Sequence, residues 1–420
     1  MNKAVKLLRD VIIIGLIVLV LLEVGLRLWP ALIPPEALRH FNPIVRSEIA
    51  ERLNLQSKTD IVDIPRDDNG PPLWINKGGA TLDTKSPDDF GFIETVTMDA
   101  QGFCNPEQDR YDPEHIDVLA LGDSLTWCTG VHPEDTWIST LGERSGESVY
   151  NLASPGKGLY EYLQILKTFG LEKTPHTVIM GVFEGNDVRD AYYYKIFRTI
   201  EETGEVTEIL TPCPFLSEGV CGIYRSLKDG FIGSNSYAFN LIVQQARRYT
   251  FRYLRNSGVD TAVPRPVFTY TVQTQDGDRV FNRGDFGDDE VRHALLVENG
   301  DITMDIFRDA LDNFVLLSKE HSFTPILIYI PSAQIAYKNF VTFEAKTLKE
   351  TFAVYSDTQR SFFEEHARDN NYRFVDATEI FQSAAEEYLT EETFLYYPNN
   401  LHLTAYGHRV LTEALEGILK

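Results

Sequence analysis

The sequence predicts an α/β protein, a three-layer α/β/α sandwich around a central parallel sheet. From residue 115 onward, short apolar runs alternate with segments of helical periodicity. Such alternation is typical of βαβ units, which build a parallel sheet covered by helices on both faces. A run such as Val118 to Leu121 is apolar throughout, as expected for a strand that is buried on both sides.

The expected elements follow one another in the order that a flavodoxin-like sheet needs. Within the helical segments the apolar residues recur at helical spacing, as in Ile306, Ala310, Phe314 and Leu317. Strands are expected at 117–121, 148–152, 177–182, 326–330 and 372–375, and helices at 135–144, 159–167, 302–319, about 344–369, 377–389 and 404–419.

The alternation is interrupted between about 190 and 300, which is too long for a plain loop and predicts an insertion with elements of its own. It contains the cluster Tyr192-Tyr193-Tyr194, an arginine-bearing helical stretch around 237–255 and a hairpin that turns at Asp276-Gly277. An insertion that leaves the third strand at its carboxyl end would hang over that edge of the sheet. The expected role of this insertion is either to select the substrate or to cap the fold.

The composition is that of a globular protein, and the charge excludes one class of partner. The chain has 420 residues, of which 43% are hydrophobic and 24% charged, and a formal net charge of -23. Nucleic acid is not expected as a partner, because phosphate binding needs a basic face. The sequence contains no H-E-x-x-H motif, no P-loop and no C-x-x-C spacing.

The amino-terminal segment predicts a membrane anchor over residues 1–29. Val11 to Leu22 carries no charge, and basic residues precede this run. Glu23 and Arg27 are four residues apart and can pair on one helix face. The amino terminus is then expected in the cytoplasm and the large domain outside. A cleaved signal peptide is the alternative, although no A-x-A-like cleavage site follows the run.

The rest of the chain divides into two expected regions. Prolines make the beginning of 30–114 a poor helix, so this region is interpreted as a stalk and an extension that packs on the main domain. Residues 115–420 form the expected α/β domain, which includes the insertion. If the domain is exported, the four cysteines are expected to pair as Cys104–Cys128 and Cys213–Cys221; four reduced thiols are the alternative.

The candidate nucleophile is Ser124, in Gly122-Asp123-Ser124 directly after the first expected strand. Gly122 allows a sharp turn, and Asp123 and Ser124 occupy the position expected for a helix N-cap. A serine there lies at the carboxyl end of a strand, the edge where ligands bind in open α/β sheets. An ordinary helix cap is the competing interpretation.

Three further candidates also follow expected strands. Gly156 could direct a backbone N–H towards the serine, Asn186 could donate from its side chain, and His402 could take the hydroxyl proton. The backbone N–H groups of Ser124 and Gly156 and the amide of Asn186 would then stabilise an oxyanion. Each residue alone also has a structural explanation, in a turn, a cap or the core.

Together these motifs resemble the GDSL/SGNH hydrolase superfamily. The resemblance rests on Gly-Asp-Ser at 122–124, Gly156, Asn186, and His402 followed by Leu403-Thr404-x-x-Gly407-His408. It implies the SGNH form of the three-layer fold and the hydrolysis or transfer of ester-linked acyl groups. Ser124 would be the nucleophile and His402 the general base, with Ser124, Gly156 and Asn186 as the oxyanion hole. No metal or organic cofactor is implied.

One departure concerns the residue that orients the histidine. The superfamily carries an aspartate two or three residues before it, where this chain has Asn400 and Asn399. An amide can orient an imidazole but carries no charge to stabilise imidazolium. Three interpretations follow: a Ser-His centre oriented by Asn399 or Asn400, an acid recruited from elsewhere in the chain, or a catalytically inactive binding or assembly module.

The sequence therefore predicts a membrane-anchored, extracytoplasmic serine esterase. Its expected substrate is an acylated glycan, a lipid or a small ester. A polysaccharide O-acetyltransferase would use the same residues, because a sugar hydroxyl can replace water as the acceptor. The inactive module is the alternative outside enzymes.

Overall fold

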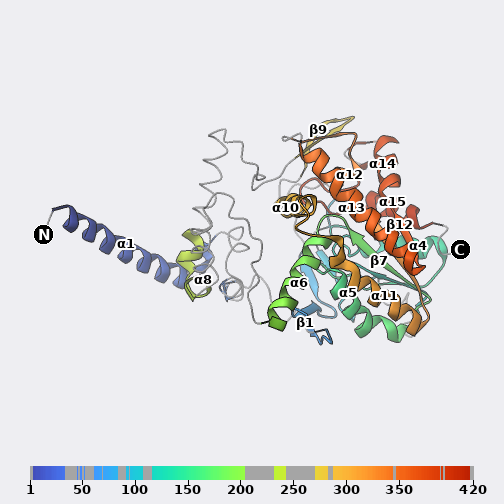
Figure 1. Cartoon of the computed structure of the whole chain (residues 1–420), viewed down its shortest axis with the longest axis horizontal. Helices are drawn as coiled ribbons and strands as arrows, with labels where there is room; N and C mark the ends of the chain where they lie inside the picture. Colours follow the sequence, from blue (N-terminus) through green and yellow to red (C-terminus); the bar gives the residue numbers. More distant parts are fainter. Residues whose placement is uncertain are drawn as a thin grey trace. The chain divides into compact units, whose positions relative to one another are not determined.

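Figure 1 shows the computed structural model of the chain. The structure describes residues 3–33, 45, 48–49, 52, 61–68, 70–83, 91–93, 95–106, 116–203, 231–242, 270–281, 287–343, 347–387, 389–390 and 393–416. The chain forms two compact units, one of residues 1–60 and 210–265 and the other of residues 61–209 and 266–420. The stalk and extension expected at 30–114 is divided: residues up to 60 belong to the first unit, and residues from 61 onward belong to the same unit as the α/β elements.

The first unit contains α1 (Lys3–Leu28) and the short α8 (Phe231–Asn235). Glu23 joins the two segments, because its carboxylate accepts hydrogen bonds from Ser236 Oγ at 2.9 Å and from the Ala238 backbone N–H at 2.8 Å. Arg27 donates to the same carboxylate at 2.7 Å, which is the i, i+4 pair expected from the sequence. The carboxyl-terminal end of α1 is therefore fixed by polar contacts.

The structure does not support the predicted transmembrane helix over 1–29. Its position is occupied by α1, in which the apolar residues Ile14, Val18 and Leu21 are exposed. Within the described residues, no helix has both the length and the apolar character that a membrane crossing requires. Glu23 and Arg27 interrupt the apolar character of α1 towards its carboxyl end.

The second unit is built on a five-stranded parallel sheet. Its strands are β5 (Val118–Leu121), β6 (Val149–Asn151), β7 (Thr177–Phe183), β10 (Thr324–Ile330) and β12 (Arg373–Asp376), and their order is β12-β10-β7-β5-β6. All four pairings are parallel. In chain order this is 2-1-3-4-5, the flavodoxin-like order. The five predicted strands and the α/β fold class are confirmed.

Helices cover the sheet as predicted, and Figure 1 shows α5, α11 and α13 in front of β7. Two pairs of these helices pack against each other: α4 (Trp137–Ser145) contacts α15 (Ala405–Leu415), and α5 (Leu159–Ile165) contacts α11 (Arg308–His321). In α11 the apolar residues Ala310, Phe314 and Leu317 are buried, as their helical spacing predicts. The helices are α4 (Trp137–Ser145), α5 (Leu159–Ile165), α6 (Asp187–Thr203), α10 (Gly287–Glu298), α11 (Arg308–His321), α12 (Ala333–Ala336), α13 (Thr347–Asn370), α14 (Thr378–Glu387) and α15 (Ala405–Leu415).

The predicted hairpin is also present, within a small antiparallel sheet. It consists of β8 (Tyr270–Thr274) and β9 (Gly277–Phe281), and Gly277 has a φ of 121° at the turn. A third strand, β11 (Val341–Phe343), pairs with β8. β11 was not predicted from the sequence. The four arginines expected around 237–255 lie outside the described residues.

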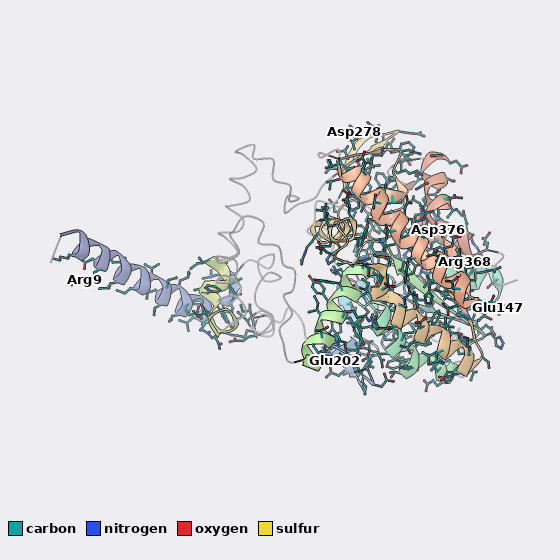
Figure 2. All side chains as sticks on the ribbon, viewed as in Figure 1. Arg9, Glu147, Glu202, Asp278, Arg368 and Asp376 are labelled. Carbon is teal, nitrogen blue, oxygen red and sulfur yellow. A yellow bond between two sulfur atoms is a disulfide. The ribbon has the colours of Figure 1, made fainter. Side chains whose placement is uncertain are left out.

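Two short hairpins precede the main sheet. They are β1 (Ile61–Ile64) with β2 (Leu73–Asn76), and β3 (Thr81–Asp83) with β4 (Thr95–Thr97). Leu73 and Ile75 are buried in the same apolar core as the central strands. Arg66 joins this extension to α5, because its guanidinium contacts Asp68 at 2.7 Å and Glu161 at 3.2 Å. Side chains fill the layers between the sheet and its helices (Figure 2).

A disulfide joins Cys104, which precedes the first strand of the main sheet, to Cys128 in the turn after β5. This confirms one of the two predicted pairings. Both half-cystines are buried, in a cluster with Val96, Trp127 and Ala153. Cys213 and Cys221, the other predicted pair, lie outside the described residues.

The Cys104→Ala/Cys128→Ala double substitution should destabilise the protein. The bridge closes a sequence separation of 24 residues, and a loop of this size corresponds to about 3 kcal/mol of stabilisation. Equilibrium unfolding in urea should therefore show a lower midpoint with little change in slope. Peptide mapping without reduction provides the control, because it should recover Cys104 and Cys128 as one linked pair. An unchanged midpoint would contradict the expectation.

Candidate active site

The candidate residues gather where the order of the sheet reverses. The chain runs from β5 to β6 at one edge and returns to β7 on the other side of β5. In parallel sheets this switch point opens a crevice beyond the carboxyl ends of the strands. Ser124 follows β5, and Asn186 follows β7. The strand order therefore places both residues on the two sides of the same crevice.

The segment after β5 forms a turn, so the predicted helix N-cap at Asp123 and Ser124 is wrong. Residues 124–129 are turns, and the next α-helix begins only at Trp137. Asp123 shapes the turn: its Oδ1 accepts from the Leu125 N–H at 2.8 Å, and its carbonyl accepts from the Trp127 N–H at 2.9 Å. Asp123 therefore caps a single turn, and no α-helix continues from it.

Gly122 is required by close packing at this turn. A Cβ atom there would lie 2.3 Å from Thr126 Oγ1, which is far inside van der Waals contact. The absence of a side chain therefore lets the chain fold back immediately after the strand, and Ser124 follows two residues later.

The loop after β6 is tied to the serine segment. The Ser154 N–H donates to the Gly122 carbonyl at 3.0 Å, and Asn151 Nδ2 donates to the Thr126 carbonyl at 2.8 Å. Gly156 follows in a turn with a φ of +66°, in the left-handed region that favours glycine. These hydrogen bonds fix the loop that carries Gly156 against the loop that carries Ser124.

Asn186 directly precedes α6 and is held by a residue one turn into that helix. Its Nδ2 donates to Asp190 Oδ2 at 3.1 Å, and Asp190 also pairs with Arg189 at 2.8 Å. An amide nitrogen carries two N–H groups, and the Asn186 side chain also hydrogen-bonds to Asp123, so a bound oxygen would replace one of these two partners. Asp190 was not predicted from the sequence, although its i+4 spacing from Asn186 was a usable signal.

His402 contacts Ser124 across a sequence separation of 278 residues. Its Nε2 lies 2.8 Å from Ser124 Oγ, within hydrogen-bond distance. A tight turn presents the ring: the Leu401 N–H donates to the Tyr397 carbonyl at 2.9 Å, and Leu401 has a φ of +59°. Asn400 Oδ1 accepts from the backbone N–H of His402 at 3.1 Å. The structure thus brings the predicted serine and histidine together.

The other ring nitrogen of His402 is buried and makes no hydrogen bond of ordinary geometry. Burial lowers the pKa of His402 to about 4, and the backbone of Asn400 opposes this with a smaller effect. Asn400 Oδ1 accepts from the backbone N–H of His402, whereas Asn400 Nδ2 is buried and makes no hydrogen bond. The ring is therefore neutral over the physiological range and can accept a proton at Nε2.

Two buried carboxyl groups lie close to the site. Burial raises the pKa of Asp123 to about 6, while the Leu125 N–H and the Asn186 side chain act to lower it. Burial, followed by repulsion from Asp123, raises the pKa of Asp187. Asp187 Oδ2 accepts from the Phe183 N–H at 2.7 Å, and Oδ1 accepts from Tyr162 OH at 2.9 Å. These contacts fix the start of α6 beside β7.

His408 and Trp127 support the site from the core. His408 is buried, and its Nδ1 accepts from the Trp137 N–H at 3.2 Å. Burial lowers its pKa to about 3. Trp127 is buried beside the disulfide. Among the described residues, no cluster of three or more His, Cys, Asp or Glu side chains is arranged to hold a metal ion.

Comparison with known proteins gives structural similarity without sequence similarity. No family model matches the chain, and no curated protein sequence matches it. The chain is similar to the crystal structure of phospholipase A1 from Streptomyces albidoflavus NA297, with 13% identity, a TM-score of 0.37, and coverage of 72% of this chain and 98% of that one.

Two further solved structures show a similar degree of likeness. The acetyl xylan esterase AlAXEase is 11% identical, with a TM-score of 0.33 and coverage of 73% of this chain and 100% of that one. The extracellular lipase from Streptomyces rimosus is 12% identical, with a TM-score of 0.32 and coverage of 71% and 98%. The flavodoxin-like fold is therefore evident from the strand order of the sheet itself, and the candidate site from the contacts among its residues.

Proposed function

We propose that the chain is a serine esterase that hydrolyses or transfers ester-linked acyl groups. The observation that carries this proposal is the 2.8 Å contact between Ser124 Oγ and His402 Nε2 at the switch point of the sheet. A serine hydroxyl paired with a neutral imidazole is the arrangement that activates oxygen for attack on a carbonyl.

In the proposed reaction, Ser124 Oγ attacks the ester carbonyl carbon while its proton passes to His402 Nε2. The carbonyl electron pair moves onto oxygen, where the N–H groups of Ser124, Gly156 and Asn186 stabilise the negative charge. Collapse of this intermediate breaks the bond to the alcohol, which leaves with the proton from His402. Water, or an acceptor hydroxyl in a transferase, then gives its proton to His402 and attacks the acyl carbonyl carbon. Collapse of the second intermediate breaks the bond to Ser124 Oγ, which takes the proton back from His402 as the acyl product leaves.

The proposed centre works as a Ser-His pair, with the turn at 397–402 in the orienting role that a carboxylate usually has. Asn400 supports this role because it holds the backbone of His402. For Asn399, the other predicted residue, we keep the proposed role of orienting the His402 ring. The absence of a hydrogen bond at Nδ1 favours the competing interpretation, a catalytically inactive module that binds an ester without cleaving it.

Substitution of the proposed nucleophile tests the two interpretations. Ser124→Ala should reduce kcat for 4-nitrophenyl acetate by at least about 10³-fold, because no other group can form the acyl-enzyme. A fluorophosphonate probe should label the wild type at Ser124. Ser383→Ala is a suitable control, because Ser383 lies on α14 and is exposed. Equal activity of wild type and Ser124→Ala would leave the inactive module as the better interpretation.

The pH profile of the reaction should reflect the buried imidazole. His402 must be neutral to accept a proton, and its pKa is lowered to about 4, so kcat/KM should hold down to about pH 5. In Asn399→Asp a nearby carboxylate would favour imidazolium, so the acid limb should move to higher pH. The measurement is kcat/KM at pH values from about 3.5 to about 8, a range that includes both the lowered pKa of His402 and the ordinary pKa of histidine. A wild-type limb near the ordinary histidine pKa would contradict the burial of the ring.

We also propose that the protein is exported and associates with a membrane through α1. The exposed apolar side chains of α1 support membrane association, and the Cys104–Cys128 disulfide is typical of an oxidising compartment.

Fractionation of cells that express the full chain tests the membrane proposal. The wild type should sediment with membranes and be released by detergent. Ile14→Glu/Val18→Glu should lose this association, because both residues are exposed on α1 and charge is costly in lipid. Recovery of the wild type in the soluble fraction would contradict the proposal.

A further inference from the structure

A pocket of about 270 Å³ adjoins the proposed oxyanion hole. Gly156 forms part of its wall, and so does Asp190, the residue that holds Asn186. Glu161, Tyr193 and Phe197 contribute further side chains from α5 and α6. A ligand in this pocket would therefore contact Gly156, one of the three proposed oxyanion donors, and Asp190, which holds another of them. The volume is slightly below the ~300–1,000 Å³ of pockets for drug-sized ligands, which suits a single small ring.

The charges around the pocket are paired with one another. Glu161 contacts Arg66 at 3.2 Å, and Asp190 contacts Arg189 at 2.8 Å. Lys157 lies between Gly156 and Gly158, and its ammonium sits 3.9 Å from the centre of the Trp74 ring. Its positive charge also acts on Glu161 and Asp190. Asp68 also contacts Arg66, at 2.7 Å, so three carboxylates match three cations and the pocket offers no net attraction for an ionic ligand.

The same groups disfavour an alkyl chain. The side chains of Glu161 and Asp190 are 12% and 16% exposed, so an apolar ligand would remove most of their remaining contact with water. Carboxylates paired with arginine still have lone pairs that can accept from hydroxyl groups. The polar side of the pocket thus suits an uncharged ligand with several hydroxyls.

Two aromatic residues form an apolar side of the pocket. Tyr193 and Phe197 are four residues apart on α6 and share one face of the helix. Tyr193 is 38% exposed, which is unusual for a ring in a wall of this size, and it packs edge-on against His293. Aromatic rings bind the C–H face of a sugar ring, whose rim carries hydroxyls. Both features of the pocket match this one class of ligand.

We propose that this pocket binds one sugar ring of an O-acylated glycan and presents its ester carbonyl to Gly156 and Asn186. This inference rests on the proposed esterase function and specifies its substrate class. Tyr193 and Phe197 act as the stacking surface, and Glu161 and Asp190 accept from the hydroxyls. The pocket then selects the alcohol part of the ester, while Ser124 and His402 act on the acyl part.

The test compares two kinds of ester with the same acyl group. Tyr193→Ala/Phe197→Ala should lower kcat/KM on peracetylated hexoses and pentoses by about tenfold or more, mainly through KM, because stacking is lost. Activity on 4-nitrophenyl acetate should fall by a smaller factor than activity on the sugar esters, because that ester has no sugar ring to stack on the two aromatic side chains. Tyr193→Phe should retain activity on the sugar esters, because the ring is kept. Val354→Ala on α13 is the control for a change at an exposed apolar side chain, since Val354 is 45% exposed.

Equal effects of the double variant on both kinds of ester, or no effect on either, would overturn the pocket assignment and leave the esterase proposal intact. A loss confined to 4-nitrophenyl esters of longer acyl chains would assign the pocket to the acyl group and also overturn it. If the wild type cleaves neither ester, the esterase proposal fails. Calorimetry of Ser124→Ala with the same sugar esters then decides the pocket alone: binding that the double substitution weakens supports it, and no binding rejects it.

Discussion

The hydrogen bond between Ser124 and His402 is the contact on which the proposed chemistry depends. The two residues are separated by 278 positions in the sequence, and each is held by a short turn rather than by a helix or strand. On one side, Gly122 and Asp123 set the turn after β5. On the other side, Leu401 adopts a left-handed backbone and Asn400 accepts from the His402 backbone. The parallel sheet supplies the rigid frame that brings these turns to one crevice.

Burial sets the electrostatics of this crevice. It lowers the pKa of His402 to about 4, and it raises the pKa of Asp123 to about 6. Both shifts favour the neutral form, because transfer of a charge into the interior is costly. A neutral imidazole is the form that can accept the proton of Ser124. The same burial leaves Nδ1 without a hydrogen bond, so the backbone turn, and no charged group, has to define the orientation of the ring.

The pocket beside Gly156 shows how the α/β unit and its amino-terminal extension act together. Arg66 comes from the extension and contacts Glu161 on α5, while Asp190 on α6 holds Asn186. The Arg66–Glu161 ion pair therefore shapes one part of the pocket wall, and Asp190, in another part, positions a proposed oxyanion donor. This link between binding and chemistry is compatible with an ester whose alcohol part must be placed before its acyl group reacts.

The sequence by itself determined the layered α/β fold, because continuous apolar runs and helical spacing are local patterns that survive in the folded chain. It also predicted that Ser124 and His402 meet, from the motifs around the two residues; Ser124 follows a strand end, whereas His402 follows α14 and a turn. It predicted the Cys104–Cys128 bridge, but not β11. It predicted a helix N-cap at Asp123, which caps a single turn instead.

Only the tertiary structure decided which side chains meet. Sequence spacing gives no information on contacts between residues far apart in the chain, so the role of Asp190, the unpartnered Nδ1 of His402 and the pocket lined by Tyr193 and Phe197 could not be predicted. Their positions depend on the order β12-β10-β7-β5-β6, which is set by packing of the whole core and not by any single segment.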